Sequence, residues 1–100
     1  MTLEEIIERI GVIRARAKFS ARALSFSIGK SDPYISTLET KRNFEPSLMT
    51  LLEIIKVCGS SPEEFFYHDI YKYKKDKEVI DYICDLTQNQ KDAILNLYKK

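Results

Sequence analysis

The chain has 100 residues, of which 44% are hydrophobic and 31% are charged, and its formal net charge is +1. This is the length of one domain with a small appendage, and the composition is that of a globular chain and not of a disordered one. No apolar run approaches 18 residues, which excludes a membrane-spanning helix, and the acidic N-terminal stretch has no secretory pattern. We therefore expect a cytoplasmic protein.

The charges are distributed unevenly along the chain. Residues 14–42 carry seven basic and two acidic side chains, whereas residues 1–13 have a net charge of −2 and residues 43–70 a net charge of −4. Residues 71–100 are mildly basic, with seven bases and five acids. One contiguous third of the protein is thus cationic between acidic flanks, which favours contact with a polyanion at that third.

The first predicted helix covers residues 2–18. Thr2 and Glu5 have the spacing of a capping box, and the apolar side chains that follow recur at helical spacing. Ser20 is a good N-cap for a second helix, which ends at Gly29, a residue suited to a left-handed stop.

A third helix follows after almost no connection. Ser31 or Asp32 is placed to cap it, and Pro33 falls in its first turn, where the missing N–H does no harm. Ile35 and Leu38 then face inward. Two short helices joined by a tight glycine turn are typical of a helix-turn-helix.

Two further helices and a C-terminal piece are predicted after this unit. Ser47 caps a helix with an inward stripe of Leu48, Leu51, Leu52, Ile55 and Cys58, and Ser61 with Glu64 opens a short helix whose Phe65 and Phe66 close the core. Residues 67–77 are a Lys- and Tyr-rich junction. Helices from residue 77 and from Thr87, the latter with a capping box to Gln90, then form a hairpin.

Other chemistry has little support in the sequence. His68 has no partner at metal-ligand or catalytic spacing, and no Gly-rich phosphate loop is present, so we expect neither an enzyme nor a cofactor. Cys58 and Cys84 lie in apolar surroundings, which favours buried free thiols over a disulfide. The alternation of Tyr and Lys at residues 71–74 is typical either of a packed junction or of base stacking, and we favour the junction.

A set of residues at fixed spacing runs through residues 10–66. In order, these are Ile13, Arg14, Ser20, Leu24, Gly29, Ser31, residues 34–36, Glu39, Pro46, Ser47, Leu51 and residues 62–66. With these matches, residues 10–66 resemble the Xre-type, lambda-repressor-like DNA-binding domain. The resemblance implies an all-α, five-helix DNA-binding domain, which we expect over residues 1–69. The helical hairpin predicted from the apolar stripes then covers residues 70–100. The partner that it implies is double-stranded DNA.

The resemblance also implies roles for individual residues. The third helix would enter the major groove, Thr37 would reach base edges, and Arg14 would form an internal ion pair with Glu39. The complete set of implied DNA-binding residues is Ser20, Ala21, Arg22, Lys30, Ser31, Asp32, Pro33, Tyr34, Ser36, Thr37, Lys41, Arg42 and Asn43.

Three positions depart from the family pattern. Ala21 stands where the family often has a DNA-contacting Gln, and Pro33 cannot hydrogen-bond a base. Lys41 stands where the family usually has Gly after the third helix, and a left-handed Lys there would cost about 1 kcal/mol.

Asp32 permits two interpretations. As a cap, it would satisfy free amides at the positive end of the third helix. As a base reader, it would accept a hydrogen bond from a cytosine N4–H, so that selectivity would rise while affinity falls. The sequence favours the cap.

The C-terminal hairpin is the candidate dimer interface. Its apolar stripes could bury each other within one chain, pair with a second copy, or bind another protein, and we favour a homodimer; a small-molecule ligand is not expected in so short a tail. The alternative function is an interaction module of the same fold that no longer binds DNA, such as an antirepressor or an antitoxin-like partner. The stripe residues are Ile80, Ile83, Cys84, Ile94, Leu97 and Tyr98.

Overall fold

The computed structural model describes residues 1–41 and 44–99. All regular secondary structure in these ranges is helical, which confirms the all-α prediction. The chain divides into two compact units, Met1–His68 and Asp69–Lys100, one residue from the boundary expected from the sequence. None of the described helices is long and apolar enough to cross a membrane. The helices are α1 (Leu3–Arg16), α2 (Ala21–Ser27), α3 (Tyr34–Thr40), α4 (Leu48–Val57), α5 (Pro62–Phe65), α6 (Tyr73–Cys84) and α7 (Gln88–Tyr98).

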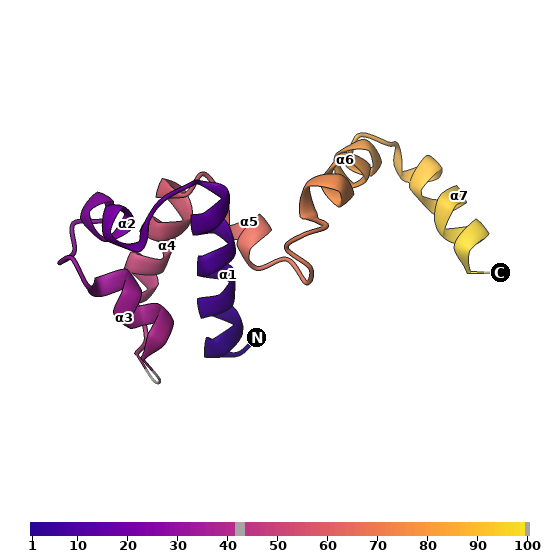
Figure 1. Ribbon diagram of the computed structural model, residues 1–100. Coiled ribbons are helices and arrows are strands. Elements are labelled where there is room, and N and C mark those ends of the chain that lie inside the picture. The colour runs from indigo at the N-terminus through magenta and orange to yellow at the C-terminus, as the bar shows by residue number, and fades with distance from the viewer. Residues whose placement is uncertain (42–43, 100) are drawn as a thin grey trace. The chain divides into compact units, whose positions relative to one another are not determined.

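The first unit gathers α1 to α5 around one core (Figure 1). Every one of its five helices contributes a side chain to this core, so none of these short helices has to be stable alone. The side chains with less than 2% of their surface exposed are Ile10, Ile13, Leu24, Ser25, Ile35, Leu38, Ile54, Ile55 and Phe65.

Local capping explains where most of these helices begin. The side chains of Thr2, Ser20, Ser47 and Ser61 each accept a hydrogen bond from the amide three residues further along the chain. The two-way capping box expected at Ser61 is not formed, because the Glu64 carboxylate accepts a hydrogen bond of 2.6 Å from the Ser60 hydroxyl instead.

Arg9 links α1, the first helix of this unit, to the chain at the end of α5, its last helix. The sequence did not predict this contact. Its guanidinium donates to the backbone carbonyls of Phe65 at 2.6 Å, of His68 at 3.2 Å, and of Tyr67. These carbonyls follow or end α5, where helical partners run out, so Arg9 satisfies acceptors that would otherwise depend on water.

Two expected core residues are exposed. Leu48 has 67% of its surface exposed because it lies in the first turn of α4, before the inward face that starts at Leu51. Phe66 is 44% exposed, and its ring packs edge-on against Phe65 with centroids 5.0 Å apart. Phe65 alone of the pair fills the core.

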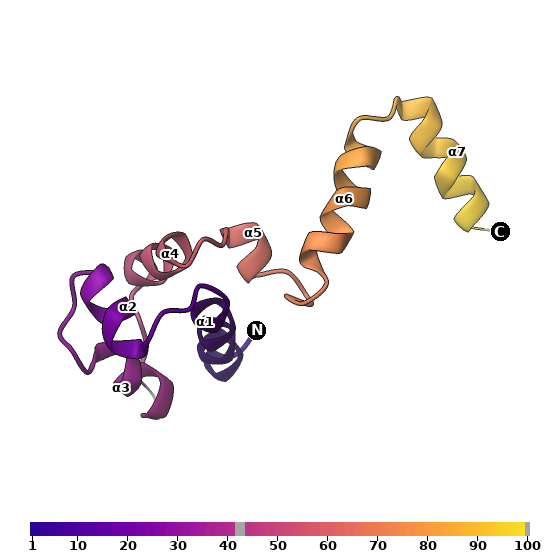
Figure 2. The ribbon, with the colours of Figure 1, turned by 45° about the horizontal axis from the view of Figure 1, so that its top comes forward.

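The second unit consists of α6 and α7 (Figure 2). Helix α6 begins at Tyr73, four residues before the predicted start, and α7 has the predicted capping box between Thr87 and Gln90. The two predicted stripes do not bury each other, because Ile83 is 37% exposed, Ile94 is 45% exposed and Tyr98 is 87% exposed. Cys84 is also exposed, so the prediction of a buried thiol is wrong there and right at Cys58.

Candidate nucleic-acid interface

A buried hydroxyl fixes α3 against α2. Ser25 has no exposed surface, and its Oγ donates to the Ala21 carbonyl at 2.9 Å while accepting from the Ile35 amide at 3.0 Å. The Ile35 amide belongs to the first turn of α3, where no intrahelical acceptor is available. Ser25 therefore acts as a cap for α3 that is supplied by the preceding helix.

The expected caps of α3 do not form. The N-cap position is Pro33, and no side chain of the local sequence makes a capping hydrogen bond there, so the interpretation of Asp32 or Ser31 as the cap is wrong. The sequence offered one weak signal for Ser25, namely a small polar residue beside the inward Leu24. Only the tertiary packing of α2 on α3 gives that residue its role.

The turn between the two helices has the expected geometry. Gly29 has φ of 72°, and the amides of Gly29 and Lys30 donate to the Phe26 and Ser25 carbonyls at 3.0 and 2.9 Å. This double hydrogen bond is the Schellman pattern, in which a left-handed glycine ends the helix. It sets the angle at which the chain enters α3.

Asp32 faces a cation on α2. Its Oδ2 lies 3.4 Å from Nε of Arg22, and both side chains are more than half exposed. The Arg22 guanidinium also lies over the Phe26 ring, 5.5 Å from its centroid. An exposed pair of this kind contributes little to stability, but it compensates the negative charge at the tip of α3.

The outer side of α3 is polar and accessible. Ser36 is exposed and donates to the Pro33 carbonyl at 3.1 Å, Thr37 is half-buried, and Lys41 is exposed just after the helix. Near the tip, Lys30 lies over the Tyr34 ring at 5.4 Å. These side chains combine hydroxyls with cations, the groups that proteins use for base edges and phosphates.

The remaining candidates lie at the start of α2 or after α3. Ser20 is exposed and caps α2 through a 3.0 Å hydrogen bond from the Ala23 amide, and Ala21 is half-buried with no polar side-chain atom. Arg42 and Asn43, the expected phosphate ligands after α3, lie outside the described residues.

Lys41 does not adopt the left-handed conformation that the family pattern suggested. Its backbone is extended, with φ of −91° and ψ of 126°, so this position carries no left-handed strain. The left-handed non-glycine residue among those described is Lys18, with φ of 61°, which follows the end of α1. Its neighbour Phe19 donates from its amide to the Arg14 carbonyl at 3.2 Å, as in a Schellman end built without glycine.

Arg14 and Glu39 form a two-pronged ion pair between α1 and α3. Nε of Arg14 donates to Oε1 at 2.7 Å and Nη2 donates to Oε2 at 3.0 Å, and each side chain is less than a quarter exposed. Arg14 also donates to the Phe19 carbonyl at 3.0 Å. The pair fixes the C-terminal part of α3, and it engages Arg14 so that this cation is not free to bind phosphate.

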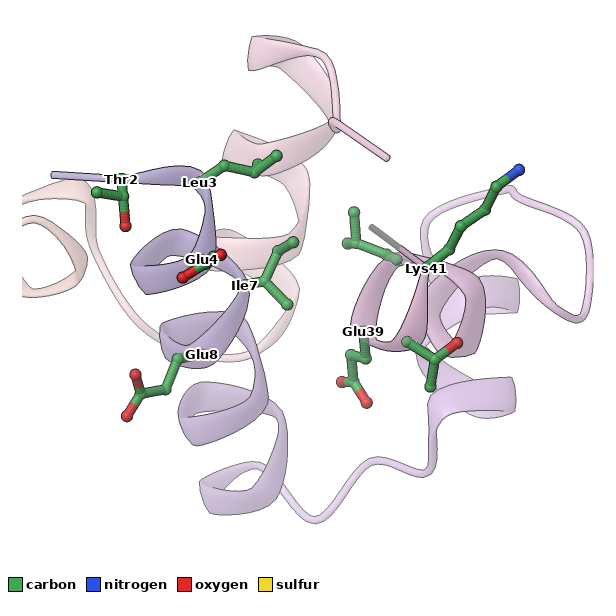
Figure 3. Close-up of a pocket in the computed structure, with 9 residues that line it drawn as sticks. Thr2, Leu3, Glu4, Ile7, Glu8, Glu39 and Lys41 are labelled. Carbon is green, nitrogen blue, oxygen red and sulfur yellow. The ribbon is translucent and has the colours of Figure 1, made fainter. Parts of the chain in front are cut away.

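A groove of about 800 Å³ lies between the start of α1 and the end of α3 (Figure 3). Leu3 and Ile7 are directed from α1 towards it, whereas the Lys41 side chain points away. Glu4 and Glu8 add negative charge to its lining, which disfavours phosphate binding, whereas the charge of Glu39 is compensated by Arg14. The cationic and hydroxyl-bearing surface of α2 and α3 is therefore the better candidate for a nucleic-acid interface. No group of three or more His, Cys, Asp or Glu side chains among the described residues is arranged to hold a metal ion.

Comparison with known families decides the assignment of this helical pair. The sequence model of a helix-turn-helix family matches residues 10–65, more than half of the chain, and the match includes α2 and α3 whole. The chain belongs to the Xre-type helix-turn-helix family. Membership places it among DNA-binding regulators, a class that is typically not enzymatic. No curated protein and no solved structure matches the chain significantly.

Proposed function

We propose that this Xre-type protein is a sequence-specific transcriptional repressor that acts in the cytoplasm and reads the major groove of double-stranded DNA with α3. The observation that supports this is the polar outer side of α3, which is fixed at its start by Ser25 and near its end by the Arg14–Glu39 pair. A recognition element must be held rigidly to distinguish bases, because each correct contact is worth only about 1–3 kcal/mol.

Base reading would fall to Ser36, Thr37 and Asp32. The hydroxyls can donate or accept, and the Asp32 carboxylate can accept from a cytosine N4–H. Asp32 does not cap α3, and its carboxylate pairs only with the exposed Arg22 among the described residues, so it can still accept a hydrogen bond at the tip of the helix. The neighbouring Arg22 offsets the repulsion between this carboxylate and DNA phosphates.

Affinity would come mainly from phosphate contacts. Each neutralised phosphate releases counterions, so the logarithm of the binding constant falls with the logarithm of the salt concentration by about 0.9 per contact. These contacts position the protein without specifying sequence. The candidates are Ser20, Arg22, Lys30, Ser31, Tyr34, Lys41, Arg42 and Asn43.

A homodimer would lengthen the DNA sequence that the protein contacts. One α3 of seven residues covers few base pairs, and helix-turn-helix dimers gain length by binding two half-sites about 34 Å apart. The exposed stripes of α6 and α7 offer the apolar surface for pairing.

Fluorescence anisotropy with duplexes selected from the host genome tests the proposal. We expect sequence-preferring binding with a steep salt slope. Thr37→Ala should change the preferred sequence, whereas Lys41→Ala should weaken all duplexes alike and reduce the slope by about one. Lys56→Ala, which removes an exposed lysine from α4, is the matched control and should change neither.

The alternative is an interaction module that has kept the fold and no longer binds DNA. Ala21 and Pro33 favour it, because neither side chain can hydrogen-bond a base, and the near-neutral total charge adds support. Absence of duplex binding at low salt, together with tight binding to one defined partner protein, would establish the module and rule out the repressor.

A further inference from the structure

Most of the cations described in residues 14–41 already have a partner inside the first unit. A cation that leaves such a partner for a DNA phosphate loses one favourable contact as it gains another. The engaged groups are Arg14 with Glu39, Arg16 with Glu64, Arg22 with Asp32 and the Phe26 ring, and Lys30 over the Tyr34 ring.

Lys18 and Lys41 differ from these cations. Both side chains are exposed, and neither takes part in an ion pair or a ring contact among the described residues. In the chain they stand on either side of the helix-turn-helix, since Lys18 precedes α2 and Lys41 follows α3. Lys41 is already a candidate for phosphate binding, whereas Lys18 has no role in the interface described above.

Lys18 has a backbone conformation that a lysine rarely adopts. Its φ of 61° lies in the left-handed region, where a residue with a Cβ is strained and glycine is not. The exposed side chain adds nothing to the core. Residues held in such conformations cluster at functional sites, so this outlier points to a use for the charge that it carries.

The turn that carries Lys18 is tied to α3. The Lys18 amide donates to the Ala15 carbonyl at 3.1 Å. On the other side of Lys18, the Arg14 guanidinium donates to the Phe19 carbonyl at 3.0 Å and to the Glu39 carboxylate of α3 at 2.7 and 3.0 Å. One side chain therefore joins the backbone beside Lys18 to the helix that is proposed to read bases. A phosphate bound at this turn would have a fixed position relative to α3, and such contacts set the register of a protein on DNA.

We propose that Lys18 binds a phosphate of the DNA backbone beside the start of α2 and, through Arg14, sets the register of α3 on the duplex. The inference rests on the proposed function and adds a contact to those that the family resemblance implies. A lysine ammonium suits the role, because it is a point charge with three donors on a flexible stem.

Substitution at position 18 separates the charge from the backbone conformation. Asparagine tolerates the left-handed region and has no charge, whereas arginine keeps the charge. By fluorescence anisotropy with the selected duplex, Lys18→Asn should bind about five- to tenfold more weakly at about 0.1 M salt and reduce the salt slope by about 0.9. The preference over mixed-sequence duplexes should not change, and Lys18→Arg should retain wild-type affinity and slope.

Lys18→Gly should bind DNA as weakly as Lys18→Asn although it unfolds at higher denaturant concentration than the wild type. A residue that served only to end α1 would not separate binding from stability in this way. The matched control is Lys56→Asn, which removes an exposed lysine from α4 and should change neither affinity nor slope. An unchanged slope in Lys18→Asn, or equal losses in Lys18→Asn and Lys18→Arg, would overturn this inference alone. If the wild type binds no duplex at low salt, the proposed function fails with it.

Duplexes with single neutral methylphosphonates locate the contact. At one phosphate position in each site, the substitution should weaken the wild type several-fold and leave Lys18→Asn unaffected, as in a double-mutant cycle between residue and phosphate. This position should differ from the one that depends on Lys41, and it should keep a constant spacing from the bases whose preference changes in Thr37→Ala. If no phosphate depends on position 18, or if its spacing from those bases varies between duplexes, the proposed role of Lys18 is wrong.

Discussion

At the scale of single residues, Ser25 fixes the start of α3 against α2. Its hydroxyl is the acceptor for a buried amide and the donor to a carbonyl of α2. We expect Ser25→Ala to lower the free energy of unfolding by about 1–3 kcal/mol, because a buried N–H is left without a partner. Chemical denaturation measures the change, and the exposed Ser27→Ala is the control. Equal stability of the two variants would mean that water replaces the hydroxyl.

Asp32 lies just before α3 and does not cap it. Since it caps no helix and pairs with the exposed Arg22, Asp32→Ala should leave the thermal unfolding midpoint nearly unchanged. Removing the carboxylate also frees Arg22 for phosphate, so we expect equal or tighter binding to mixed-sequence DNA and lower preference for the best duplex. Anisotropy titration measures both quantities. Loss of stability with unchanged preference would restore the structural role for Asp32.

At the scale of helices, the ends of α1 and α3 show where a glycine is needed. Lys18 is left-handed and Lys41 is extended. Lys18→Gly should therefore raise the free energy of unfolding by up to about 1 kcal/mol, because glycine adopts this conformation without strain. Lys41→Gly should not raise the free energy of unfolding, because glycine at this position only adds conformational entropy to the unfolded chain. Denaturant titration of the two variants checks this pair, and a gain at position 41 would contradict it.

The Arg14–Glu39 pair connects the first helix to the third. Its two hydrogen bonds are partly buried, so Glu39→Gln should destabilise the chain by about 1.5–3 kcal/mol. A double-mutant cycle with Arg14→Gln isolates the coupling between the two residues. Additive effects of the two substitutions would show that the pair does not act as a unit.

At the scale of the whole molecule, the two cysteines report how differently the two units are packed. Burial raises the pKa of the Cys58 thiol, an effect that the nearby Arg14 charge partly offsets, whereas Cys84 is exposed. At neutral pH we expect a thiol reagent to modify Cys84 first and Cys58 slowly. The rate at Cys58 should rise only when the pH increases above 9.0, the ordinary pKa of a cysteine thiol, because burial raises the pKa of this thiol. Reaction of the Cys84→Ser variant as fast as the wild type would show that Cys58 is accessible.

Local sequence determined much of this protein. The all-α class and the helix-turn-helix can be identified from local signals, because these act within a few residues. The signals are the helical spacing of the apolar residues, the glycine stop at Gly29, and the caps at Thr2, Ser20 and Ser47. The junction carries weaker local signals. The Lys-rich start of α6 has no apolar period, and the helix begins four residues before the start that the sequence predicts.

Tertiary structure alone decided how the start of α3 is held and how the end of α5 is joined to α1. The cap that Ser25 provides for α3 and the hydrogen bonds from Arg9 to the carbonyls at the end of α5 join groups of different helices that meet only after packing. The same holds for exposure: Leu48, Phe66 and Cys84 carry apolar side chains that helical spacing predicts to be buried, yet all three are exposed in the folded chain. Helical periodicity specifies which side of a helix is apolar, and only the packed fold specifies what, if anything, lies against it.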